Sequence, residues 1–180
     1  DLSTLDTVLG TQGKEKMVSF DLSALGYVVD KMQFPADAVK KIAAAANGVQ
    51  GLSVSFPGGM SVALDAKALG QAAAKTSGAD VTVSIRRTTS SALSEQQRQA
   101  VGNRPAWNVD ATSSGKNISG TDGKITVEVP YELRPGEQAD GLVVYYVDEQ
   151  GNRQACETRY DAEKKRIRWS TSHLSVHLIG

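Results

Sequence analysis

The sequence predicts an α+β fold in which a small layered strand-helix-strand duplication packs against an antiparallel β-sandwich. Three observations support this prediction. An alanine-rich unit occurs twice before residue 90, and short runs of alternating residues separated by turn signals fill the chain after residue 105. The 180 residues, of which 40% are hydrophobic and 22% charged, suit one folded domain or two small parts that share a core.

The charge balance and the hydropathy exclude several classes of function. Twenty Lys and Arg residues balance twenty Asp and Glu residues, so no large uniform field is available to hold nucleic acid or an acidic membrane. No apolar run approaches the roughly 18 residues that a membrane span needs. The abrupt start at Asp1 and the end at Gly180 lead us to expect a segment of a longer protein.

The first part of the chain is read as an arm followed by a duplication. Residues 1–16 are expected to form a short helix or an ordered arm that joins a preceding module. Residues 17–90 are expected to form the duplicated subdomain. Within it, residues 34–39 align with residues 64–69, and each copy continues into an alanine-rich stretch and then an alternating strand. Those two strands are predicted at residues 52–56 and 81–85.

Helical spacing and end signals predict that both alanine-rich stretches are helices. Pro35 is tolerated at the start of the first helix, and Asn47-Gly48 is a stop signal. Asp65 can cap the second helix, and Gly78 can end it. The apolar faces are formed by Val39, Ile42, Ala43 and Ala46 in one copy, and by Leu69, Ala72 and Ala73 in the other.

A third, short helix opens the second part of the chain, residues 91–180. Ser94 and Gln97 occupy the positions of a capping box, and Gly102 can close the helix. Beyond Pro105, six short strands at regular spacing predict an antiparallel sandwich. They are expected at residues 107–111, 125–129, 142–147, 155–160, 166–170 and 174–179, with turns at 122–123, 148–152 and 161–165.

Several short motifs in this part resemble one known family. They are Ser91-Ala92-Leu93, Val101-Gly102-Asn103-Arg104-Pro105, residues 129–137, residues 143–148, Tyr160-Asp161-Ala162 and the closing Thr171-Ser172-His173-Leu174-Ser175. Together they resemble a module of Firmicutes cell-surface proteins that often accompanies S-layer homology repeats or a wall anchor. The resemblance extends over most of the chain from about Lys16. It implies an extracellular location at the cell surface or cell wall, and a modular context.

Motifs of the common enzymes are absent from the sequence. It has no Gly-x-Ser-x-Gly elbow, no His-Glu-x-x-His and no phosphate-binding glycine motif. His173 and His177 would stand about 13 Å apart along a regular strand, too far to share a metal ion. The single thiol, Cys156, permits neither an internal disulfide nor a cysteine metal site, and we expect it to be a half-buried strand residue. We therefore expect no enzyme activity, no metal and no cofactor.

One motif nevertheless has a known chemistry. His173-Leu174-Ser175 resembles the cleavage site of autoproteolytic β-sandwich domains, in which the hydroxyl attacks the preceding carbonyl and histidine acts as the base. That reaction requires a kinked backbone. The alternation of the segment predicts instead a regular last strand, with His173, Ser175 and His177 on its outer face and the Leu174–Ser175 bond intact.

Aromatic and basic residues give a binding alternative. Trp107 and Tyr131 are the candidates for a glycan or peptidoglycan platform, although core packing is the favoured role for most of the aromatic residues. The basic stretch from Lys164 to Arg168 is suited either to anionic wall polymers or to a solvated hairpin.

The expected function is a non-catalytic structural or spacer module of a Gram-positive surface protein, in the extracellular space. The alternatives are a module that binds cell-wall polymer or glycan, and a self-cleaving sandwich that uses His173 and Ser175. The expected partners are adjacent modules of the same protein, with a wall polymer or another surface protein as further possibilities. Neither nucleic acid nor a membrane span is expected.

Overall fold

The fold is known from a computed structural model. The structure describes residues 18–22, 31–43, 51–75, 80–113, 116–117, 123–173 and 175–180. Within these ranges the chain is a sheet-dominated α+β protein with two sheets and few helices. The expected arm at residues 1–16 lies outside the described residues.

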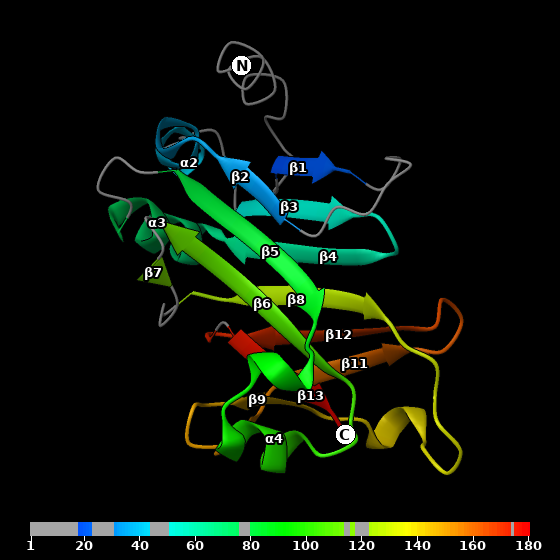
Figure 1. The fold of residues 1–180 in the computed structure, drawn as a ribbon. Coiled ribbons are helices and arrows are strands. Elements are labelled where there is room, and N and C mark those ends of the chain that lie inside the picture. Colours follow the sequence, from blue (N-terminus) through cyan, green and yellow to red (C-terminus); the bar gives the residue numbers. More distant parts are fainter. Residues whose placement is uncertain are drawn as a thin grey trace.

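The first sheet has six strands and is antiparallel apart from one parallel pair at its end. Its order is β1 (Val18–Asp21), β3 (Gly51–Phe56), β4 (Met60–Asp65), β8 (Ile125–Pro130), β12 (Arg166–Thr171) and β11 (Glu157–Asp161). Figure 1 shows these strands stacked from one end of the molecule to the other, behind the second sheet.

The second sheet is antiparallel, and it lies in front of the first one in Figure 1. Its order is β10 (Arg153–Ala155), β9 (Val144–Val147), β13 (Ser175–Ile179), β6 (Ala106–Ser113), β5 (Val81–Arg87) and β2 (Lys31–Phe34), and the short β7 (Lys116–Asn117) also pairs with β6. Buried side chains of both sheets belong to one hydrophobic cluster, so the two sheets share a core.

The sheets cross the boundary that the sequence analysis places near residue 90. Strand β4 pairs with β8 in the first sheet, and β5 pairs with β6 in the second. The strands of residues 17–90 are therefore hydrogen-bonded to those of residues 91–180, and they form no sheet of their own. This pairing cannot be predicted from periodicity, because the spacing of apolar residues indicates which face of a strand is buried and does not identify the neighbouring strand.

The helices largely follow the predicted signals. Helix α2 (Ala36–Ala43) begins directly after Pro35, and α3 (Ala66–Lys75) is capped by Asp65, whose Oδ1 accepts a hydrogen bond of 2.8 Å from the amide of Ala68. The two helices pack against each other. The stop signals at residues 47–48 and 78 lie outside the described residues.

Helix α4 (Glu95–Val101) confirms the third predicted helix. Ser94 and Gln97 form the capping box in both directions, and Gly102 follows the helix with a positive φ. The helix is short, yet it covers part of the outer face of the second sheet. Its Val101 joins a separate hydrophobic cluster with Val176 and Leu178 of β13.

One predicted strand is divided in two. Residues 155–160 were expected to form a single strand, but β10 and β11 belong to different sheets and Cys156 lies between them. The amide of Cys156 donates a hydrogen bond to the carbonyl of Val144, and the chain then crosses from the second sheet to the first. This crossing closes one side of the molecule.

Candidate functional site

The last strand, β13, lies in the interior of the second sheet, between β6 and β9. The predicted alternation of this strand is wrong, because its four residues from Val176 to Ile179 are all buried. Helix α4 covers the face of Val176 and Leu178, which was expected to meet the core, while the face of His177, which was expected to meet solvent, meets the core between the sheets. His177 therefore points away from solvent and is 0% exposed.

The backbone at Ser175 departs from regular strand geometry. Its φ is +104°, in a region that L-residues rarely adopt and that lies beyond the left-handed helical well. The expectation of a regular strand starting at this motif is therefore also wrong. Leu174, which supplies the carbonyl of the candidate bond, lies outside the described residues.

His173 is held by two kinds of contact. Its amide donates a hydrogen bond of 3.0 Å to Oγ1 of Thr171, and that hydroxyl donates to the His173 carbonyl, also at 3.0 Å. Its ring stacks on Tyr146 with 4.7 Å between centroids. These contacts fix the orientation of His173 immediately before the candidate bond, as a positioned base would require.

His177 occupies a pocket between two aromatic rings. Its centroid lies 5.6 Å from that of Tyr146 and 5.7 Å from that of Trp169. Its Nδ1 lies 3.2 Å from the carbonyl oxygen of Ser175, so the neutral ring donates from Nδ1. Its Nε2 has no hydrogen-bond partner in the described part of the chain. Burial lowers the pKa of His177 to about 4.

The sequence did not predict that the rings of His173 and His177 contact the same residue. Both rings contact Tyr146, because β13 pairs with β9 in a register that places His177 opposite Tyr146. The available signal was the count of two histidines on one segment. The partner strand, however, could not be deduced from it.

A cleft of about 340 Å³ adjoins this cluster. Tyr146, Cys156 and Thr171 line it together with Asp65, at the end of β4, and Lys124, directly before β8. Burial raises the pKa of the Cys156 thiol, so the thiolate, the reactive form, is disfavoured. Cys156 is half-buried, as predicted, but it lies between β10 and β11 and not within a strand. The cleft therefore lacks an activated cysteine nucleophile.

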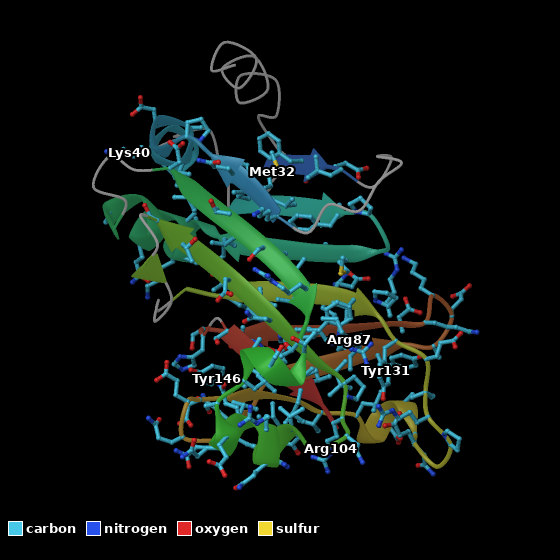
Figure 2. All side chains as sticks on the ribbon, in the orientation of Figure 1. Met32, Lys40, Arg87, Arg104, Tyr131 and Tyr146 are labelled. Carbon is cyan, nitrogen blue, oxygen red and sulfur yellow. The ribbon has the colours of Figure 1, made fainter. Side chains whose placement is uncertain are left out.

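The candidate platform residues, Trp107 and Tyr131, are both core side chains, each 8% exposed. The guanidinium of Arg87 lies 5.7 Å from the ring centroid of Trp107. The Tyr131 hydroxyl donates a hydrogen bond of 2.7 Å to Glu137, and burial together with this bond raises the pKa of Tyr131 to about 12. Figure 2 shows Tyr131 and Tyr146 on opposite sides of the molecule. Trp107 and Tyr131 thus leave little ring surface for a polymer.

The described residues contain no group of three or more His, Cys, Asp or Glu side chains suited to a metal ion. Among the helices of the same described ranges, none is long and apolar enough to cross a membrane. Comparisons of the chain with protein-family models, with curated proteins and with solved structures found no match.

Proposed function

We propose that this chain is a non-catalytic structural module, an antiparallel β-sandwich with added helices, in an extracellular surface protein of a Gram-positive bacterium. It would space or present the segments on either side of it, at the cell surface or in the cell wall. The surface-protein motifs described above support the location. The shared core of the two sheets supports the assignment as a sandwich.

The observation that carries a spacing role is the placement of the first and last strands. Strand β1 lies at one end of the stack of strands, and Gly180 lies near the other end (Figure 1). Gly180 is fixed in position, because it exchanges two backbone hydrogen bonds of 3.0 and 3.3 Å with Val143. Segments joined at β1 and at Gly180 would therefore be held toward opposite ends of the stack of strands.

Force spectroscopy tests this role. With marker domains fused at both ends, we expect the chain from β1 to β13 to unfold in a single step, because β13 is hydrogen-bonded on both sides and the core is continuous. The measurement is the contour length released in that step. Gradual lengthening at low force, or the early release of β13 alone, would show that the module does not bear load as a unit.

Self-cleavage is a second candidate, and the φ of +104° at Ser175 is the observation that favours it. In this reaction the Ser175 hydroxyl would attack the Leu174 carbonyl carbon while His173 takes the hydroxyl proton. The peptide C–N bond would break as an ester forms, and the proton would pass to the new amine. Water would then hydrolyse the ester to a carboxylic acid and restore the hydroxyl.

Intact mass under denaturing conditions separates the two candidates. On the structural proposal we expect no mass that lacks residues 175–180, including in an aged sample and after hydroxylamine treatment, which cuts an ester. A loss of residues 175–180 in the wild type that Ser175→Ala abolishes would establish self-cleavage instead. Asn108→Ala, altered on the neighbouring strand β6, serves as a control for nonspecific hydrolysis.

A further inference from the structure

Arginine side chains face each other on the outer surface of the first sheet. Arg159 of β11 lies directly opposite Arg168 of β12, and both are exposed. Like charges at directly opposed positions destabilise an antiparallel pair. An acidic residue at either position would form a cross-strand ion pair. The pairing of these two arginines is therefore locally destabilising, so the stability of the fold does not explain why both positions are arginine.

The neighbouring carboxylates do not neutralise this cluster. Glu128 of β8 is shared by two arginines, at 2.9 Å from Arg168 and 3.7 Å from Arg166. The carboxylate of Asp161 accepts hydrogen bonds from two backbone amides of the β11–β12 turn. The guanidinium of Arg159 makes no ion pair or hydrogen bond with any residue that the structure describes. Two of the three guanidinium groups thus share the carboxylate of Glu128, and that of Arg159 pairs with no carboxylate among the described residues.

These side chains surround a cleft of about 440 Å³. Four cationic residues, Arg159, Lys164, Arg166 and Arg168, line it with only two acidic ones, Glu128 and Asp161. The cleft is therefore positively charged on a chain whose formal net charge is zero. Arg166 and Arg168 are two residues apart on one strand face, which places their Cα atoms about 6–7 Å apart along the strand.

We propose that this arginine cleft binds a phosphate-bearing polymer that lacks bases. A planar carboxylate is satisfied by one guanidinium side-on, whereas a tetrahedral phosphate accepts hydrogen bonds from several donors in different directions. Here the donors come from β11, from β12 and from the turn that joins them. The row along β12 and the size of the cleft suit successive phosphates of one chain. This site is additional to the structural role, and neither depends on the other.

Nucleic acid fits the cleft less well than such a polymer does. Proteins that hold single strands stack bases on exposed aromatic rings. The one aromatic residue at the cleft, Tyr160, is half-buried, packs edge-on against Tyr131 and donates its hydroxyl to the Tyr131 carbonyl. No exposed aromatic ring is available for stacking elsewhere in the described part of the chain either, because its one large exposed hydrophobic side chain is Leu133.

Protection of an edge strand is the plainer reading of these charges. Strand β11 is at the edge of its sheet, and charged residues there prevent pairing with another molecule. A glutamate at position 159 would protect that edge as well as arginine does, and it would also pair with Arg168. Edge protection therefore explains charge at this position but not two opposed charges of the same sign.

The experiment titrates the full chain with synthetic poly(glycerol phosphate) by calorimetry, at low and at physiological salt. We expect saturable binding that weakens as salt rises. Arg159→Glu should weaken binding at least about tenfold, while the melting temperature rises by about 1–3 °C because the opposed charges now attract. Arg159→Lys keeps the charge but loses the planar fork, and it should show a smaller loss of affinity.

Lys40→Glu is the matched control, because it changes the net charge equally at an exposed position of α2, a helix at the opposite end of the molecule from β11 and β12 (Figures 1 and 2). It should leave the affinity within about twofold if binding is local rather than a net-charge effect. Equal losses in both variants, or no saturable binding, would overturn the proposal. So would binding of polygalacturonate or oligothymidylate as tight as that of poly(glycerol phosphate), since these probes carry carboxylates and bases respectively. Inorganic phosphate alone should bind more weakly than the polymer, and equal affinity would exclude a polymer site.

Discussion

Trp169→Ala is expected to lower the free energy of unfolding by about 3–5 kcal/mol. Trp169 is 0% exposed on β12, and its ring contacts His177 of the opposite sheet. It is the largest of the fully buried side chains in the described residues. Its removal leaves a cavity between two sheets that strand pairing holds in place, so the surroundings can collapse only in part.

Urea denaturation monitored by far-ultraviolet circular dichroism measures this change. Trp169→Phe is the matched variant, because it keeps an aromatic ring and removes an indole N–H that has no partner in the described residues. It should lower the free energy of unfolding by only about 1 kcal/mol, because the loss of packing is partly offset by the removal of a buried donor without a partner. If the alanine variant is as stable as the phenylalanine variant, the two sheets do not depend on this ring for their packing.

The second large effect is on stability at acid pH. Burial holds the pKa of His177 at about 4 against an ordinary value of 6.5, so the folded chain binds a proton at this ring less readily than the unfolded chain. Above pH 6.5 the ring is neutral in both the folded and the unfolded chain, and the stability of the fold is then unaffected by this group. As the pH falls from 6.5 to 4 the unfolded chain takes up the proton first, so the free energy of unfolding decreases. Protonation of His177 should lower the free energy of unfolding by about 3 kcal/mol across that pH range.

His177→Phe isolates this effect. We expect urea midpoints of the wild type to fall between pH 6.5 and 4 and those of the variant to change much less. Glu137 and Asp148, whose pKa values are lowered by hydrogen bonds, and Asp110, whose pKa is raised by burial, contribute equally to both proteins. Parallel curves for the two proteins would show that His177 is accessible to protons in the folded state.

The two effects are coupled, because the rings of Trp169 and His177 are in contact. Water that enters the cavity of Trp169→Ala would solvate the imidazolium, raise the pKa of His177 and flatten the acid dependence. The pH dependence of the alanine variant therefore reports whether the cavity is hydrated. A slope equal to that of the wild type would indicate a dry cavity.

Local signals predicted local structure well. The capping box of Ser94 and Gln97, the cap by Asp65 and the turns at residues 148–152 and 161–165 all appear in the structure. Each depends on residues within one or two turns of chain, whose preferences the sequence shows directly. The strands β3, β5, β6, β8 and β12 likewise overlap the predicted ranges.

Long-range features were not predictable in the same way. Strand alternation indicated a last strand but assigned His177 to the solvent side, because nothing local shows that its face meets the core between the sheets while α4 covers the other face. The pairing of Arg159 with Arg168 depends on a register set by the turn at residues 161–165 and by the core. The conformation of Ser175 has no signature in composition, since serine is not a residue that favours a positive φ.

The pairing across residue 90 also governs when the chain can fold. Strands β4 and β5 pair with β8 and β6 across that position, and β13 fills the position between β6 and β9. Until β13 emerges from the ribosome, β6 and β9 each lack a neighbour along one edge, and unpaired edges recruit other chains. High contact order of this kind slows folding. The second sheet can therefore be completed only after β13, its last strand in the sequence, has been synthesised.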